Sequence, residues 1–598
     1  METVIKGIMD DFKKDFTFLE KNDNKLFEHL ISYITISKYS PNSFSDNEDI
    51  ESVNIDEKGQ FGLDSMAIVI NGNLIKSKDD LEMYNGKNDD LDVKIIFIQS
   101  KLTEKIDLGD FLKTTTAVRN FLKKDHHMLE NNSNIKNILE IYETLFSNYE
   151  YTKRFTSNSP ECFIYFVTLS KEISNSSLNE MKARQKEDIS VICSDIKNFY
   201  VDILGKQYVI DAYKEVTNNI STEIYFKNSL QLDEIPNVKE ARIGYLSGEE
   251  FLKIIQDTSG YLRKRIFYEN VRDYQGSDNF VNKEIRETIE NNETRDYFIL
   301  MNNGLTIITK GFQSLGGNKF ALRDFQIVNG CQTTNEIFNT KNISKNLLIP
   351  VKIIHTDNMD VIAKIVKANN RQSPISDEAF ITLTIFHKEL QDYIKYKSKE
   401  MPLKVFYARR MGETDKDIKD KYQVITLHGL IRAFTSVYLQ KTNETYNNNP
   451  ALILKRNKDK FFKETHPSDI YYIAVYLIAN FIKFIQNNPS YSEYYDKKNY
   501  IAMITRCLLT ETVDIPSFES KQMKNEIIKI LKVIKEDKLD DYYKKAINII
   551  FQVNKKYSNN NPSSSKKQIS SYNNRTKAYN DDILKKIKET LKAFYKRY

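Results

Sequence analysis

Two short, almost continuous apolar segments place the strongest constraint on how this 598-residue chain can fold. Residues 93–100 (VKIIFIQS) and 162–169 (CFIYFVTL) contain a single charged side chain between them, Lys94. Strands of this composition are buried on both faces, which requires helices above and below the sheet. Helical periodicity before, between and after the two segments supplies those helices. We therefore expect an α/β domain over residues 1–175.

The segment before residue 93 adds a hairpin to the expected sheet. Residues 63–70 are apolar and strand-like, and they are followed by Asn71-Gly72, the dipeptide typical of a type I′ turn. Leu74 and Ile75 would begin the return strand. The polar stretches 40–60 and 79–92 are expected to be loops.

The length of the chain requires further domains, because a single core rarely serves more than about 300 residues. Strand and helix patterns alternate up to residue 390, and helical patterns dominate beyond it. The overall fold class is therefore mixed α/β. The expected units are an α/β domain at 1–175, a mixed α/β core at 176–390, an all-helical domain at 391–556, a polar linker at 557–580 and an amphipathic helix at 581–598. The apolar face of that last helix (Ile583, Ile587, Leu591, Phe594 and Tyr598) is expected to dock on the protein itself.

Composition excludes several classes of protein. Four cysteines lie far apart without a CxxC pair, which excludes a disulfide scaffold or a Cys-rich zinc module and indicates a reducing, cytoplasmic compartment. No apolar run approaches about 18 residues, so no membrane span is expected. The net charge of +6 is small for this length. Residues 551–598, however, carry twelve Lys and Arg against three Asp and Glu, and such a tail either binds nucleic-acid phosphates or keeps the protein soluble.

One group of residues has the composition of a hydrolytic site. Asp64 opens the predicted strand 63–70, and Gln99 and Lys101 close the predicted strand 93–100 on one face of the sheet. If these two strands are antiparallel neighbours, Asp64 lies near Lys101. A carboxylate and an amide oxygen suit Mg²⁺, while a lysine can position water and stabilise charge on a phosphate. Glu28 is a further candidate acid; the alternative is that these residues are solvated strand ends.

These residues stand in a recognisable context. FGLDSMAIVI followed by IIFIQSK resembles the PD-(D/E)xK nuclease fold, in the QxK form found in Mrr-like restriction endonucleases. Those enzymes also carry a glutamate on the first helix, which Glu28 resembles. The resemblance implies that Asp64, Gln99, Lys101 and Glu28 are catalytic, that Asp64, Gln99 and Glu28 hold Mg²⁺ or Mn²⁺, and that the domain is an endonuclease acting on phosphodiester bonds, with DNA as the expected substrate.

A second series of motifs follows along the chain. The motifs are 270–276 (NVRDYQG), 281–285 (VNKEI), Phe298 with 302–307 (NNGLTI), 326–334 (QIVNGCQTT), 368–375 (ANNRQSPI) and, more weakly, 406–410 (FYARR). In this order they resemble the AIPR family, named for abortive infection and phage resistance. The resemblance is strongest over 240–390, and where the family usually has a glutamate this chain has Ala408. It implies a role in anti-phage defence, in which the core recognises or gates nucleic acid.

The AIPR motifs are rich in groups that bind nucleotides. Amide side chains can read bases, arginines can contact phosphates, and the backbone N–H groups of a helix start suit an anion. Thr333 or Thr334 is expected to cap the helix after Gly330. The alternative is a polar network that only fixes loops. The candidate binding residues are Arg272, Asn303, Gly304, Asn329, Gly330, Gln332, Asn370, Arg371 and Gln372.

Three hypotheses remain open from the sequence. The leading one is a Mg²⁺-dependent nuclease of anti-phage defence, with a second copy of the chain or another defence protein as a possible partner. The second is a non-catalytic binding or sensing module with a degenerate nuclease domain, favoured by the absence of charge on Gln99. The third is a nucleotide-binding switch centred on Asn303, Asn329 and Gln332. No GxxxxGK[ST] motif is present, which argues against a P-loop ATPase.

Overall fold

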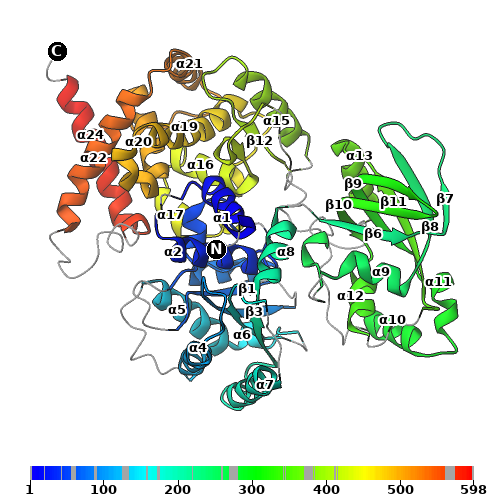
Figure 1. Ribbon diagram of the computed structural model, residues 1–598. Helices are drawn as coiled ribbons and strands as arrows, with labels where there is room; N and C mark the ends of the chain where they lie inside the picture. The colour runs from blue at the N-terminus through cyan, green and yellow to red at the C-terminus, as the bar shows by residue number, and fades with distance from the viewer. Residues whose placement is uncertain are drawn as a thin grey trace.

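The chain forms three domains, shown in the computed structural model of Figure 1. The N-terminal sheet domain lies below the helical C-terminal domain, and the central sheet domain lies to one side of both. The structure describes residues 3–18, 20–41, 43–55, 62–85, 90–123, 133–156, 159–171, 176–217, 220–257, 260, 262–267, 280–340, 343, 345–369, 382, 384–409, 413, 415, 417–558 and 573–595.

A five-stranded sheet in the order β2-β1-β3-β4-β5 forms the N-terminal domain. β1 pairs antiparallel with β2 and β3, whereas β3, β4 and β5 run parallel. Asn71 and Gly72 have φ angles of 48° and 78°, so the predicted type I′ turn is confirmed. The strands are β1 (Ser65–Ile70), β2 (Asn73–Leu74), β3 (Val93–Ser100), β4 (Glu161–Val167) and β5 (Asn198–Leu204).

Helices cover both faces of this sheet, as the apolar strands predicted. Ile96 and Ile98 of β3 pack against one helical layer, and Ile95 and Phe97 pack against the other. β5 lies beyond residue 175 yet pairs with β4, so the domain extends past the predicted boundary to α8. The first layer contains α1 (Thr3–Asp15), α2 (Asp23–Ile36) and α8 (Lys206–Val216); the second contains α4 (Leu108–Leu122), α5 (Ser133–Ser147), the short α6 (Tyr149–Thr152) and α7 (Ser176–Ser190).

Two short helices occupy segments that were predicted to be loops. The helix α3 (Asn47–Glu51) lies within 40–60, and the 3₁₀ helix η1 (Lys78–Tyr84) lies within 79–92. The side chain of Asp46 caps α3 by accepting a hydrogen bond from the backbone N–H of Asp49. A helix of five residues is too short to show apolar periodicity, which is why the sequence pattern did not indicate it.

The central domain contains a six-stranded sheet in the order β6-β10-β9-β11-β8-β7. Its pairs are antiparallel except for β9 and β11, which run parallel. Its main core lies between one face and α9, α10 and α12, while α13 packs on Ile308 and Val328 of the other face. The elements are β6 (Ser221–Tyr225), β7 (Asn228–Gln231), β8 (Glu240–Ser247), α9 (Gly248–Ile255), η3 (Lys264–Phe267), α10 (Phe280–Glu290), η4 (Arg295–Tyr297), α11 (Phe298–Met301), β9 (Leu305–Gly316), β10 (Lys319–Asn329), α12 (Cys331–Asn339), β11 (Leu348–His355) and α13 (Met359–Asn369).

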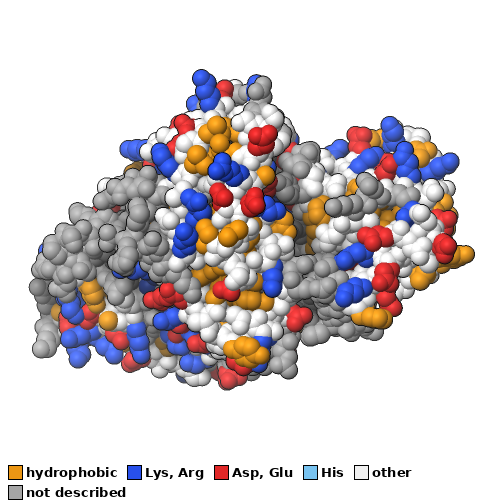
Figure 2. All heavy atoms as spheres, turned by 90° about the horizontal axis from the view of Figure 1, so that it is seen from below, with side chains coloured by type: hydrophobic (Ala, Val, Ile, Leu, Met, Phe, Trp, Pro, Cys, Tyr) orange, Lys and Arg blue, Asp and Glu red, His pale blue; other side chains and the backbone are white. Residues whose placement is uncertain are grey.

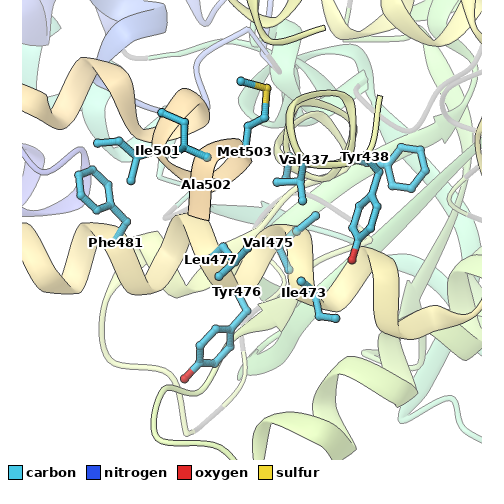
Figure 3. Packing of buried hydrophobic residues seen from close by; sticks show 14 of the residues in the cluster. Val437, Tyr438, Ile473, Val475, Tyr476, Leu477, Phe481, Ile501, Ala502 and Met503 are labelled. Carbon is cyan, nitrogen blue, oxygen red and sulfur yellow. The ribbon is translucent and has the colours of Figure 1, made fainter. Parts of the chain in front are cut away.

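The C-terminal domain is helical, with only a two-residue strand pair, β12 and β13. Figure 3 shows side chains of α16, α19 and α20 interdigitating in its core, among them Val437, Val475 and Ile501. The elements are α15 (Ile385–Ser398), β12 (Phe406–Tyr407), η5 (Lys421–Gln423), β13 (Val424–Ile425), α16 (Leu427–Val437), α17 (Thr442–Asn447), α18 (Pro450–Arg456), η6 (Lys458–Lys460), α19 (Ser468–Asn487), η7 (Pro489–Lys497), α20 (Lys498–Thr510), α21 (Lys521–Lys535), α22 (Asp540–Ser558) and α24 (Lys577–Tyr595).

Two helices of this domain bear on expectations from the sequence. α19 is long and apolar enough to cross a membrane, although no such segment was expected from the sequence. Most of this helix is buried inside the domain, as is typical of a core helix of a soluble protein. α24 docks on the protein itself, because Ile583, Ile587 and Leu591 are buried in the helical core. The side chains of Phe594 and Tyr598 lie outside the described part of the chain.

The surface carries charges of both signs. Figure 2 views the molecule from below, and on this face Lys and Arg side chains are interspersed with Asp and Glu side chains. With a net charge of only +6, the interaction of this protein with a nucleic acid would depend on local sites and not on a field over the whole molecule.

Candidate active site

Asp64 and Gln99 meet at one end of the N-terminal sheet. Their strands are antiparallel neighbours, which is the condition that the sequence left open, and the register Ser65 to Ile98 places Asp64 opposite Gln99. The side-chain amide of Gln99 donates a hydrogen bond of 2.9 Å to Oδ1 of Asp64. Asp64 is 1% exposed and Gln99 is 3% exposed. The sequence-predicted pair therefore forms a buried contact.

Ser100 is a functional neighbour that sequence reasoning missed. Its backbone N–H and its hydroxyl both donate to Oδ2 of Asp64, at 2.6 and 2.7 Å. Together with Gln99, it gives the Asp64 carboxylate three neutral hydrogen-bond donors among the described residues. Ser100 stands between Gln99 and Lys101 in the sequence, but strand alternation assigned it to the other face.

Lys101 continues the pairing of β3 with β4. Its backbone N–H donates to the carbonyl of Val167 at 2.9 Å, so the residue is anchored at the carboxyl ends of two parallel strands. Its side chain is only partly buried. Within the described part of the chain, its ammonium group makes no hydrogen bond or ion pair. Lys101 thus presents a positive charge at the sheet end where α/β proteins commonly bind ligands.

Glu28 lies on α2, in the helical layer on the other face of the sheet. Its carboxylate pairs with Lys25 at 2.8 Å, one turn away on α2. α2 packs on the face formed by Ile96 and Ile98, whereas Asp64 and Gln99 extend the opposite face. The hydroxyl of Ser32, which follows Glu28 by one turn, lies 2.5 Å from that of Ser65. The structure therefore brings α2 against the start of β1, with the Glu28 charge balanced by Lys25.

The arrangement does not fit a bound Mg²⁺ as it stands. Mg²⁺ requires near-octahedral oxygen ligands and retains several waters. Here Gln99 presents its N–H group and not its oxygen to Asp64, and both side chains are almost fully buried. In the described ranges, no group of three or more His, Cys, Asp or Glu side chains is placed to hold a metal ion. A metal would require this group to open and the Gln99 amide to turn.

Two glycines of the AIPR motifs adopt backbone conformations that the ends of the central strands require. Gly304 and Gly330 have φ angles of 81° and 101°, a region that other residues rarely adopt. A Cβ at position 330 would lie 2.6 Å from Cδ2 of Leu305, so only glycine fits there. The side-chain amide of Asn329 donates to the carbonyl of Gly304 at 3.4 Å. For these three motif residues, the contacts are those of a network that fixes the strand ends.

The start of α12 differs from the prediction. Its N-cap is Gly330, without a side-chain cap, so the expected capping by Thr333 or Thr334 is wrong. Thr334 instead donates back to the carbonyl of Gly330 at 2.8 Å, and Thr333 accepts from Asn302 at 3.0 Å. The positive φ of Gly330 lets the chain turn directly from β10 into the helix, so a capping side chain before it is not needed.

The remaining candidates are distributed unevenly. Asn303 is exposed at the β9 end of the sheet, and Gln332 is half-buried on α12. Arg272, Asn370, Arg371 and Gln372 lie outside the described residues. The described residues of this set are therefore not shown to share one pocket.

The segment around Ala408 is built into the helical domain. Ala408 is buried, and its backbone N–H donates to the carbonyl of Ile425 at 2.9 Å. The next residue, Arg409, donates to the side-chain oxygen of Gln391 at 2.9 Å, and its backbone N–H donates to Glu413 at 2.8 Å. Nearby, burial lowers the pKa of His387 to about 3, so this histidine stays neutral. The contacts of Ala408 and Arg409 hold this segment within the helical domain.

Comparison with known proteins finds a family resemblance for one part of this architecture. Residues 267–562 match the model of the family described as AIPR protein, from η3 through α22. No curated protein and no solved structure matches the chain. The match begins after the N-terminal sheet, so the resemblance of that domain to Mrr-like nucleases stays a prediction. Over residues 267–562, the chain is similar to the AIPR family.

Proposed function

We propose that this protein acts in anti-phage defence and that its N-terminal domain cleaves phosphodiester bonds in nucleic acid. The AIPR family, whose name refers to abortive infection and phage resistance, supports the defence role. The nuclease part rests chiefly on one observation: the sheet brings Asp64, Gln99 and Lys101 to the same end of β1 and β3. Four buried cysteines without disulfides suit a cytoplasmic protein.

The chemistry of these side chains suits phosphoryl transfer. Cleavage of a phosphodiester develops negative charge on the phosphate, which a positioned lysine stabilises. Lys101, with its unpartnered ammonium, takes this role. Asp64 orients the attacking water once its carboxylate is released from Gln99 and Ser100. The proposed substrate is DNA, with Mg²⁺ or Mn²⁺ as cofactor and the central and helical domains recognising or gating the strand.

A second candidate function is favoured by the same geometry. Three neutral donors satisfy Asp64, and the group is almost fully buried. Such an arrangement is also what a non-catalytic domain that binds or senses nucleic acid would retain for stability. Because the same geometry suits both functions, an experiment must distinguish catalysis from binding.

The test incubates the purified full-length protein with plasmid, linear DNA and RNA, each with Mg²⁺, Mn²⁺ or EDTA. Lys105, exposed in the loop after β3, provides a matched control for Lys101. We expect metal-dependent cleavage that Lys101→Ala abolishes and Lys105→Ala retains. Binding without cleavage under all conditions would support the second candidate, and cleavage that persists in Lys101→Ala would remove this residue from the mechanism.

A further inference from the structure

A cavity of about 100 Å³ lies between the N-terminal domain and the helical domain. In the described part of the chain, its N-terminal side is formed by the end of α1 and the residues before α3. Its helical side is formed by η5, β13, α16, α19, η7 and α20. None of the described lining residues belongs to the candidate active site at Asp64. The two domains therefore share an internal space that the proposed function does not use.

The cavity extends along α16 from an exposed mouth to a charged inner end. Thr426 at the start of this helix is exposed, Gly429 is half-buried and Arg432 is 6% exposed, and all three line the cavity. Because an α-helix rises about 1.5 Å per residue, Arg432 lies about 9 Å from Thr426 along the helix axis. At the inner end, Asp46 lies 3.9 Å from Arg432 and 3.3 Å from Lys498. Asp46 and Lys498 also line the cavity, so a ligand that enters past Thr426 meets two cationic side chains.

Arg432 and Lys498 have hydrogen-bond donors that their protein partners do not use. Nη1 and Nη2 of Arg432 donate to the two oxygens of Asp49 at 2.8 and 2.7 Å. Its Nε is buried without a hydrogen-bond partner among the described residues. The ammonium group of Lys498 has three N–H donors; it donates to Glu48 and lies beside Asp46. Since a buried donor without an acceptor destabilises the fold, an acceptor group in the cavity is bound favourably.

The groups around this inner end are buried or half-buried, and they carry more positive than negative charge. Burial raises the pKa of Glu48 from 4.5 to about 8, so near pH 7 this carboxyl group retains its proton. Five cations then face three carboxylates: Lys76, Arg432, Lys497, Lys498 and Arg575 against Asp46, Asp49 and Asp496. Charges in a protein interior normally have counter-charges, so this excess favours a bound anion.

The size of the cavity and this excess charge select a phosphate group. Sites for drug-sized ligands measure about 300–1,000 Å³, so a cavity of about 100 Å³ accepts only a small group. A phosphate monoester carries a charge of about −1.5 to −2 near pH 7 and offers three acceptor oxygens, which match the excess charge and the available donors. A carboxylate supplies a single negative charge and is the poorer match.

We propose that this cavity binds a phosphate group, free or as the end of a small phosphate ester, with Arg432 and Lys498 as hydrogen-bond donors. The bound group lies between the two domains and balances the excess of positive charge, so it stabilises their association. The proposal does not depend on cleavage of nucleic acid at Asp64, and its test requires no nuclease activity.

Calorimetric titration of the full-length protein with inorganic phosphate, at about pH 7 and constant ionic strength, tests the proposal. Gly429→Leu fills the cavity without removing a charge, because a Cβ at this position would lie 3.6 Å from Oγ1 of Thr426 and 3.7 Å from Cγ2 of Ile425, which both line the cavity. The matched control is Gly7→Leu, at an exposed position of α1 with nothing within 4 Å of the added Cβ. We expect a dissociation constant below about 1 mM for the wild type and for Gly7→Leu, and an increase of about tenfold or more for Gly429→Leu.

Titration with adenosine monophosphate separates the two sources of the phosphate group. Binding tighter than that of inorganic phosphate indicates an ester, and equal or weaker binding indicates free phosphate. Sodium acetate provides the comparison with a carboxylate and should give no saturable binding. The proposal is overturned if neither phosphate compound binds, if acetate binds as tightly as phosphate, or if Gly429→Leu retains the wild-type affinity.

Two further measurements keep the test decisive if Gly429→Leu does not fold. Asp49→Asn combined with Arg432→Gln removes an anion and a cation at nearly constant shape and should weaken phosphate binding about tenfold or more. Unchanged affinity in this variant would contradict the site. In the wild type, phosphate should slow hydrogen exchange in α3 and at the start of α16, while the central sheet keeps its rates. Equal slowing in all regions would show the general stabilising effect of this salt and would also contradict the site.

Discussion

Replacing Gln99 with glutamate would test the geometry of the site without assuming any activity. The side-chain amide of Gln99 lies 2.9 Å from Oδ1 of Asp64, and both residues are almost fully buried. Gln99→Glu therefore places a second carboxylate against the first at nearly constant volume. Two such groups cannot both ionise at this distance, so the pair must retain a proton or acquire a cation.

The expected size of the effect follows from the distance. Two unit charges whose centres lie about 4 Å apart repel by about 4 kcal/mol at an effective dielectric constant of about 20. This corresponds to a rise of about three pKa units for one of the two carboxyl groups. Because the raised pKa belongs to the folded state alone, the variant keeps its stability below about pH 4. It loses roughly 4 kcal/mol as the pH rises to about 7.

Urea unfolding at pH 4 to 8 measures this loss, with and without Mg²⁺ or Mn²⁺. A divalent cation can replace the retained proton, so we expect millimolar metal to restore stability at pH 7 and EDTA to abolish the restoration. The control is Asp64→Asn combined with Gln99→Glu, which exchanges the acid and the amide and returns the site to a single charge. A pH profile for Gln99→Glu equal to that of this control would refute the arrangement of the two side chains.

Three further predictions follow from single residues. Lys101→Ala should lower the cleavage rate about 100-fold or more while leaving the melting temperature nearly unchanged, since its side chain fills no core; a rate equal to that of Lys105→Ala would contradict this. Burial raises the pKa of Glu48 from 4.5 to about 8. The wild type should therefore lose stability relative to Glu48→Gln as the pH rises from about 4.5 to 8, by up to roughly 5 kcal/mol in urea unfolding. A constant difference in stability across that pH range would argue against a buried acid. Gly330→Ala should lower the unfolding free energy by roughly 2–4 kcal/mol, through its positive φ and the clash with Leu305, and an unchanged melting temperature would show that β10 can relax.

The sequence alone determined the features that depend on neighbouring residues. Asn71-Gly72 specifies a hairpin because both residues tolerate positive φ. The apolar run of β3 specifies a strand between two helical layers, and its alternation places Gln99 on the face of Ile95 and Phe97. The antiparallel pairing that brings Asp64 to Gln99 was also predictable, since the two strands are close in sequence.

Only the tertiary structure decided the state of the site. The backbone N–H of Ser100 reaches Asp64 through a local geometry at the strand end that alternation does not describe. Arg432 and Asp49 are 383 residues apart, and Lys498 and Glu48 are 450 apart. A charged residue has many possible partners of opposite charge several hundred residues away in the sequence. Which of them meet is set by the packing of whole domains, which the sequence pattern of one segment does not contain.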